Sequence, residues 1–155
     1  MEMSNSKGDP DALACRNSYG DTLVAHFPLV RVHSSGRLTV PVAGVPPFMI
    51  GVEPTIHGLV VDLSCPFLEQ IQRKPPMFEG VAMNPRSLAA FGSIRVLPED
   101  EAGTSWGLEL RHQVHAKMLT NDWLLFYADV LPKVSRELTK SLGSMFGGVP
   151  TLSVE

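Results

Sequence analysis

The sequence predicts an α+β domain in which a curved antiparallel β-sheet packs against a long C-terminal α-helix. Residues 104–118 alternate between apolar and polar side chains with a period of two, which is typical of a strand with one buried face. Farther along, apolar residues recur every three or four positions, which is typical of an amphipathic helix; they are Leu131, Val134, Leu138, Leu142 and Met145. A helix with one apolar stripe buries it against the apolar faces of strands, so the two elements are expected to pack together.

Length and composition fit this fold class. The chain has 155 residues, which suits one domain. It contains 13 glycines and 13 prolines, and this content favours several short strands over a helical bundle. We expect a polar N-terminal tail over residues 1–12, a single α+β domain over 13–148 and a C-terminal tail over 149–155.

Charge and cysteine content limit the partners and the compartment. The net charge of −3 and the pI near 5.9 give nucleic acid no general electrostatic reason to bind. The N-terminal stretch MEMSNSKGDPDA lacks the apolar segment of a secretory signal, and no later run is long enough to span a bilayer. We therefore expect a soluble protein of the cytoplasm or of an organelle, a plastid included. Cys15 and Cys65 lie outside any CxxC spacing and fit a reducing compartment, although a single disulfide between them stays open.

The N-terminal half is expected to form short strands. The run from Asp21 to Val42, DTLVAHFPLVRVHSSGRLTVPV, holds two β-branched-rich segments on either side of a hairpin turn at residues 33–36. Pro28 restricts the first segment to a sheet edge or a bulge, because proline lacks the N–H that a central strand donates. The following AGVPPFMIGVEP predicts a turn and then a short strand.

The middle of the chain continues this pattern. In IHGLVVDLSC the apolar residues, Val61 among them, share one face with His57, while Asp62 and Ser64 take the other. QIQRKPPMFEG predicts a polar loop, and MFEGVAMN and SLAAFGSIRVLP predict further strands, with one helical turn at SLAAF as the alternative. PEDEAG predicts the tip of a hairpin.

The 104–118 strand separates two histidines. Trp106, Leu110 and Val114 fall on its apolar face, and His112 points with them. His115 points with the charged row, because residues three apart in a strand lie on opposite faces. The two histidines are therefore not expected to bind one metal ion.

The C-terminal helix has identifiable ends and one obstacle. Thr120 or Asn121 is expected to cap its start, and Gly143 or Gly147 to end it. Pro132 lacks an N–H and clashes one turn back. The segment is thus either kinked one turn before Pro132 or is a short turn followed by a helix that begins there.

Common catalytic and cofactor motifs are absent from the sequence. It has no GxSxG elbow, no GxxxxGK[ST] loop, no HExxH, no GxGxxG after a strand and no Cys/His zinc spacing. Carboxylates are available at Asp62, Glu79, Glu109 and Asp122, but no two are marked out as acid and base. The sequence predicts no cofactor and no metal site, and it leaves catalysis undecided.

Three side chains have two interpretations each. On its apolar face, His112 is either hydrogen-bonded within the core or directed into a cavity, where a desolvated imidazole titrates lower than a free one. His57 lies at a strand start and is either at the rim of that cavity or in it. Arg95 is expected to face solvent; in the opposite register it would lie inside beside Phe91 and anchor a carboxylate or phosphate.

The order of elements resembles a known fold. VEPTIHGLVVDLSC, FEGVAMN, the pair of long strands and the closing DWLLFYADVLPKVSRELTKSL helix are similar to the helix-grip fold of START-like lipid-transfer domains, birch-pollen-type allergens and polyketide cyclases, and in particular to their uncharacterised plant and cyanobacterial members. The resemblance covers residues 48–146, and the two short helices usual after the first strand are missing between residues 32 and 48. It implies an apolar ligand in the gap between the sheet and the last helix. The residues expected to line that gap are His112, His57, Trp106, Leu110, Val114, Val61, Phe91, Leu131, Val134 and Leu138.

Three functions follow as hypotheses. The first is binding or transport of a hydrophobic small molecule without catalysis. The basic helix ridge formed by Lys133, Arg136 and Lys140 is then either simply solvated or a peripheral membrane contact. The second is a cyclase- or hydrolase-like enzyme that uses His112 or His57. The third is a structural or assembly subunit with a filled core and no ligand.

Overall fold

The structure is a computed structural model, and it describes residues 9–75 and 92–153. Its helices are α2 (Pro10–Val24), the short 3-10 turn η2 (Ala116–Met118) and α4 (Asn121–Phe146). Its strands are β1 (Arg31–Val32), β2 (Leu38–Val40), β3 (Phe48–Thr55), β4 (Gly58–Ile71), β5 (Ser93–Pro98), β6 (Trp106–His115) and β7 (Val149–Pro150).

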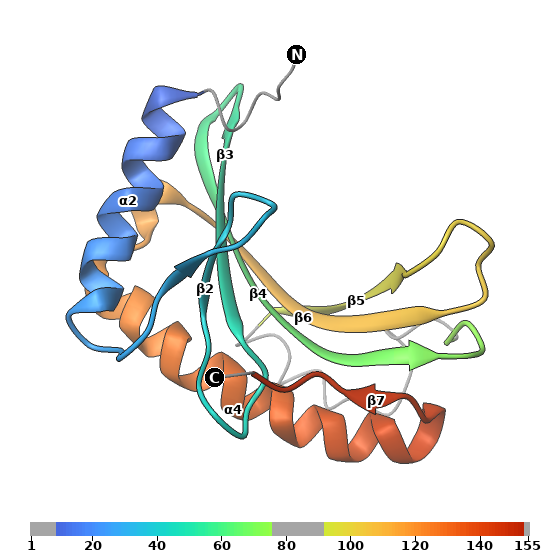
Figure 1. Ribbon diagram of the computed structural model, residues 1–155. Coiled ribbons are helices and arrows are strands. Elements are labelled where there is room, and N and C mark those ends of the chain that lie inside the picture. The colour runs from blue at the N-terminus through green and yellow to red at the C-terminus, as the bar shows by residue number, and fades with distance from the viewer. Residues whose placement is uncertain (1–8, 76–91, 154–155) are drawn as a thin grey trace.

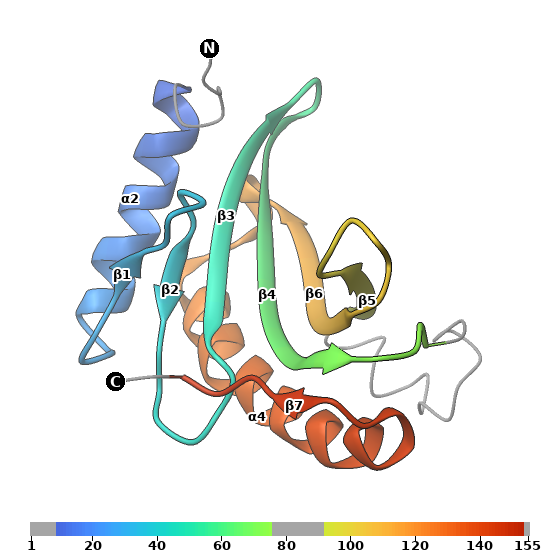
Figure 2. The same cartoon turned by 45° about the vertical axis from the view of Figure 1, so that its right-hand side comes forward.

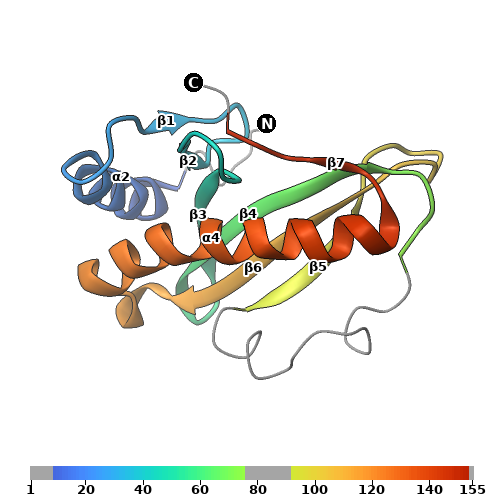
Figure 3. The same cartoon turned by 90° about the horizontal axis from the view of Figure 1, so that it is seen from below.

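All seven strands belong to one antiparallel sheet. Their order is β1-β2-β3-β4-β6-β5, and β7 pairs with the far end of β4. The sheet is strongly curved and bends away from α4, so both helices lie along its convex side (Figures 1 and 2). Viewed from below, α4 crosses in front of β4, β6 and β5 (Figure 3). The predicted fold class, a curved antiparallel sheet packed against a long C-terminal helix, is confirmed.

The first segment of the predicted N-terminal strands is helical instead. α2 begins at Pro10, inside the expected tail, and the Asp9 carboxylate caps it by accepting a hydrogen bond from the Ala12 N–H at 2.8 Å. Tyr19 and Leu23 follow Ala12 at helical spacing and are buried on the same side. The strand predicted from Asp21 is therefore wrong up to Val24, because a capped start and packing against the sheet override weak strand propensity.

The hairpin expected around residues 33–36 is present but short. The His33 N–H donates to the Arg37 carbonyl at 2.7 Å, and Gly36 supplies the positive φ of 88° that this turn requires. β1 lies at the sheet edge, and Pro28 precedes it without joining the ladder.

Two strands differ in length from the prediction. β4 continues through Pro66 as far as Ile71, into the expected loop, and its pairing with β6 shifts register between Pro66 and Leu68. This irregularity accommodates a proline in a central strand. β6 ends at His115 and gives way to η2, so the predicted 104–118 strand is shorter than expected. MFEGVAMN and the whole of SLAAF, including Phe91, lie outside the described residues.

α4 is one continuous helix. The Thr120 side chain accepts a hydrogen bond from the Trp123 N–H at 3.2 Å, and Gly147 follows the last turn with a φ of 74°. The helix begins at Asn121, so the alternative of a helix starting at Pro132 is wrong. Pro132 is buried within the helix against the sheet, and this packing offsets the lost hydrogen bond.

The core lies between the sheet's convex face and the two helices. Its fully buried members come from β4, β6, β3 and α4 and include Val61, Leu63, Leu110, Phe48 and Leu131. Both cysteines are free. Burial raises the pKa of the Cys65 thiol, so it behaves as a small apolar side chain in this core. No helix in the described ranges is long and apolar enough to cross a bilayer.

Candidate functional site

The predicted ligand-lining residues on the strands share the face that meets α4. β4 and β6 pair Val61 with Val114, Leu63 with His112 and Cys65 with Leu110, so these side chains point to the same side of the sheet. Leu131 and Leu138 of α4 are buried against them, and Val134 and Trp106 are half-buried at the margin of the same core. The predicted faces are confirmed, and Phe91 lies outside the described residues.

This inner face is packed rather than hollow where it meets the middle of α4. Val61, Leu110 and Leu131 are each 0% exposed. Two hollows in the described part of the chain lie elsewhere, one beside α2 and one at the β5–β6 hairpin tip near Trp106. The binding of a hydrophobic molecule between sheet and helix therefore stays a prediction.

The histidines do not converge. His57 lies in the exposed two-residue turn between β3 and β4 rather than on the face of Val61, so its expected position in the strand row is wrong. Its carbonyl accepts a hydrogen bond from His115 Nε2 at 2.7 Å, and His115 Nδ1 accepts one from the Lys117 N–H at 3.2 Å. These two hydrogen bonds fix the His115 ring at the end of the sheet, where it does not approach His112.

His112 is the one predicted site histidine on the inner face. Its ring packs against Tyr127 of α4 with 4.8 Å between ring centroids. Burial lowers the pKa of its imidazole. Trp123 and Phe126 extend this aromatic group onto the exposed surface at the start of α4.

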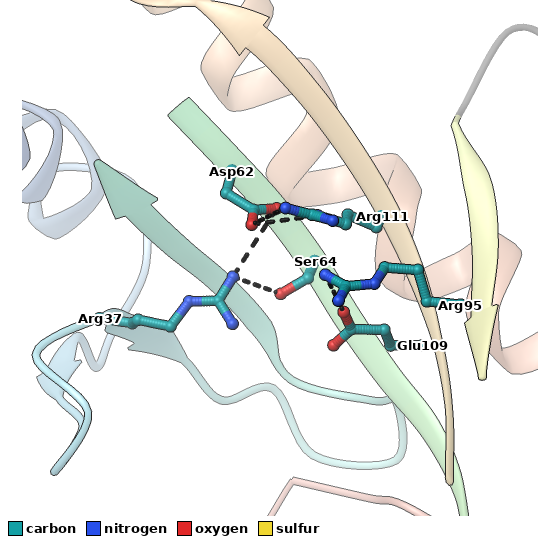
Figure 4. A network of polar contacts seen from close by, with 6 residues as sticks. All are labelled: Arg37, Asp62, Ser64, Arg95, Glu109 and Arg111. Carbon is teal, nitrogen blue, oxygen red and sulfur yellow. Dashed lines mark hydrogen bonds and ion pairs between the residues drawn. The ribbon is translucent and has the colours of Figure 1, made fainter. Parts of the chain in front are cut away.

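The opposite, concave face of the sheet carries a polar network that no described helix covers (Figure 4). Arg111 Nε donates to both carboxylate oxygens of Asp62 at 3.0 and 3.1 Å, and its Nη2 lies 2.9 Å from Oδ2. Arg37 Nη2 donates to Ser64 Oγ at 2.8 Å and lies 3.9 Å from Asp62. Asp62 therefore holds two guanidinium groups over the centre of this face.

The floor of the concave face is buried although the face is uncovered. Ser64 is 0% exposed and Glu109 7% exposed, because the long arginine side chains lie over them. Arg95 Nη1 lies 3.6 Å from Glu109, which is too far for a strong hydrogen bond. Burial raises the pKa of Glu109, and the nearby Arg37 and Arg95 only partly offset that rise. The hydrogen bond that Arg111 donates to Asp62 raises the pKa of Arg111, which stays charged.

A hollow of about 290 Å³ adjoins this network at the edge of β3. α2, the 33–37 turn, β3 and β4 form its walls, and the charged residues among them are Arg16, Arg37, Glu53 and Asp62. Gly51 lets Arg37 lie flat across β3, because a Cβ there would be 3.2 Å from Arg37 Nε. The hollow is therefore bounded by a guanidinium that the network fixes in place.

Donor groups in the hollow are incompletely used. Arg16 Nη1 donates to the Gly36 carbonyl at 2.7 Å and Nη2 to Asn17 Oδ1 at 3.1 Å, but Arg16 Nε is buried and has no hydrogen-bond partner within the described residues. Arg37 donates through Nη2 alone among the hydrogen bonds of the described chain. Buried donors without partners are uncommon and costly, so Arg16 Nε is a candidate donor to a bound acceptor group.

The edge of β3 adds main-chain groups to this hollow. Thr55 and Gly58 flank a two-residue turn, so the peptide groups of Thr55, Glu53 and Gly51 bond to β4. The peptide groups of Val52 and Pro54 therefore point to the opposite edge of β3, the edge that β2 occupies. Because β2 pairs with β3 only as far as Ile50, the N–H and C=O of Val52 face the side of α2 with no partner strand among the described residues.

Sequence analysis found only part of this site. The alternation of β4 placed Asp62 and Ser64 on the outer face, and Arg95 was expected to face solvent, as it does. Arg16, Arg37 and Glu53 carried no signal, because their meeting depends on α2 and on a turn 27 residues from Ser64.

Comparisons with known proteins give no relative from which to transfer a role. No protein-family model, curated protein or solved structure matches this chain significantly. Within the described residues, no group of three or more His, Cys, Asp and Glu side chains is placed to hold a metal ion. The chemistry of the site must therefore be argued from its own geometry.

Proposed function

We propose that this protein binds a small organic anion in the hollow between α2, the 33–37 turn and β3. The observation that carries the proposal is the buried, unpartnered Arg16 Nε beside the clamped Arg37 guanidinium. Guanidinium groups bind carboxylates through charge-assisted hydrogen bonds, and the volume of the hollow is at the lower end of ligand sites. The described lining holds no His, Cys, Lys or Tyr, and Arg111 engages its Asp62 carboxylate, so binding rather than turnover is proposed.

The test is a titration of the purified protein with sodium isovalerate, followed by calorimetry and by the backbone amide NMR signals. We expect saturable binding with the largest shifts at Gly36, Gly51 and Val52. Arg16→Gln and Arg37→Gln should each raise the Kd about tenfold or more, because a charge-assisted hydrogen bond is lost. Arg136→Gln, on the exposed side of α4, is the matched control and should leave the Kd unchanged.

Two results would overturn this function. One is the absence of saturable binding by isovalerate and by other small carboxylates. The other is binding whose NMR shifts fall on α4 and β6 and which Arg16→Gln leaves intact.

A second candidate function is the binding of a hydrophobic small molecule on the inner face, as the helix-grip resemblance implies. It is supported by the aromatic group of His112, Tyr127, Trp123 and Phe126, of which Trp123 is 52% exposed. Such a group can extend an apolar wall at the margin of the core. Native mass spectrometry should then show a co-purified apolar ligand, and Trp123→Ala should weaken the binding of a fluorescent fatty acid. A clean apo mass with no fatty-acid binding would count against it.

The basic ridge of α4 gives less support to peripheral membrane contact. Lys133 pairs with Asp129 at 3.0 Å and Lys140 with Glu137 at 3.1 Å, so two of its three cations have acidic partners within the helix. These neighbours reduce the net positive charge that an anionic surface would attract.

A further inference from the structure

We infer that the ligand of the α2–β3 hollow carries a protonated amino group beside its carboxylate, as a free α-amino acid with a small apolar side chain does. This inference rests on the proposed function and names the ligand class of the same site. Its basis is the mixed charge of the walls, which hold two guanidinium groups, Arg16 and Arg37, and two carboxylates, Glu53 and Asp62.

The two carboxylates of the hollow differ in what they have left to bind. Asp62 is engaged by Arg111 and approached by Arg37. Glu53 is exposed and forms no ion pair or hydrogen bond within the described residues. A simple anion on the arginines would lie close to the Glu53 carboxylate, whose charge Arg111 offsets only through space and without an ion pair, and this disfavours binding. A ligand with a neighbouring ammonium group would instead neutralise Glu53.

The main-chain groups of Val52 fit the same two ligand charges. An unpaired strand edge offers an N–H donor and a C=O acceptor side by side, which is how strand edges bind extended peptide units. The N–H can donate to a ligand carboxylate and the C=O can accept from a ligand ammonium. An amino acid presents both groups on adjacent carbons, so it can use both at once.

The remaining walls set the size and polarity of the side chain. Ala12, Leu13 and Val52 contribute apolar surface to a hollow of about 290 Å³. Small or branched aliphatic side chains fit such a space and can pack against these three residues. L-Valine is therefore a suitable probe.

The experiment compares L-valine with two analogues of the same shape, isovalerate without the ammonium group and isobutylamine without the carboxylate. Calorimetry or amide NMR on the full chain gives each Kd. We expect L-valine to bind about tenfold or more tightly than either analogue, because each lacks one charge-assisted contact. Glu53→Gln should weaken valine about tenfold and leave isovalerate unchanged or tighter. Glu101→Gln, in the exposed hairpin tip, is the matched control.

The outcomes separate this inference from the function beneath it. If isovalerate binds as tightly as valine and Glu53→Gln changes neither, the amino-acid inference is wrong while anion binding stands. If none of the three compounds binds, both are wrong. Glu53 is exposed and unpaired, so its substitution is not expected to disturb folding.

Discussion

The two faces of the central sheet differ in chemistry although the same strands build both. On β4, Leu63 and Cys65 are fully buried against α4, while Asp62 and Ser64, which alternate with them, face the concave side and hold arginines. The inner face is stabilised by non-directional apolar packing and the outer face by hydrogen bonds of fixed geometry. Alternation thus lets one strand carry the core on one side and a candidate site on the other.

The difference also shows where each face has capacity left for a ligand. On the inner face, Leu110 and Val61 are fully buried, so they leave little apolar surface for a ligand to contact. The outer face and its adjoining hollow retain unpartnered polar groups at Arg16 Nε and Glu53. Substitutions on the inner face should therefore change stability most, and those near the hollow should change binding more than stability.

The largest effect on stability is expected for Leu110→Ala on the inner face. Truncation of a fully buried leucine removes apolar contact and leaves a cavity, which costs about 2–5 kcal/mol of the free energy of unfolding. Urea unfolding followed by tryptophan fluorescence measures it. Ile56→Ala, at a side chain 95% exposed, is the control and should change stability by less than about 0.5 kcal/mol. A cost for Leu110→Ala as small as that of the control would contradict the packed inner face.

A smaller effect is expected for Asp62→Asn on the outer face. The substitution leaves Arg111 and Arg37 without their shared carboxylate, and loss of a charge-assisted hydrogen bond in a partly buried site costs about 1.5–3 kcal/mol. The same urea experiment serves here. Asp129→Asn removes an exposed pair with Lys133 and should cost less than about 1 kcal/mol. Equal costs for the two variants would mean that the outer network is no more than surface salt bridges.

The sequence predicts the faces of this sheet better than its N-terminal elements. Period-two alternation follows directly from strand geometry, so the faces of Val61, Asp62 and Leu110 were predictable. α2 was missed because its apolar positions are sparse and because Gly20, a weak helix former, lies within it. The helix forms through the Asp9 cap and through packing against Leu38, which the local sequence pattern does not show.

The candidate site was predictable only in part for a related reason. Asp62 and Ser64 follow from the strand pattern, but Arg16 reaches the Gly36 carbonyl across 20 residues of chain. Such contacts depend on how elements dock, which local periodicity does not encode. The sequence also did not predict that β4 continues past Pro66. The strand accommodates this proline through a register shift in its pairing with β6, which depends on the partner strand and not on the local sequence.

A third prediction concerns the pH dependence that Glu109 gives the outer face. The pKa of Glu109 is raised in the folded state, so protonation of this carboxyl stabilises the fold. The stabilisation is complete below the ordinary pKa of about 4.3 and is lost as the pH rises through the raised pKa. Glu109→Gln should remove this loss, so the variant should gain stability relative to wild type as the pH rises toward neutrality. Glu137→Gln, at an exposed position of α4, should show no such trend, and an identical trend in both variants would argue against burial as its cause.

The smallest effect is expected at His112, and it has the opposite sign because the group is a base on the inner face. Burial lowers the pKa of His112, so the folded state favours the neutral imidazole. The free energy of unfolding therefore decreases as the pH falls from the ordinary histidine pKa of about 6.5 through the lowered pKa of His112. His112→Phe keeps a ring against Tyr127 but cannot titrate, so its unfolding midpoint should fall less than that of wild type on acidification. An NMR titration of the His112 ring measures the pKa directly. A value at or above that of a free imidazole would mean that water or an acidic partner reaches this side chain, and the inner face would then be less dry at its aromatic end than Leu110 and Val61 are at its centre.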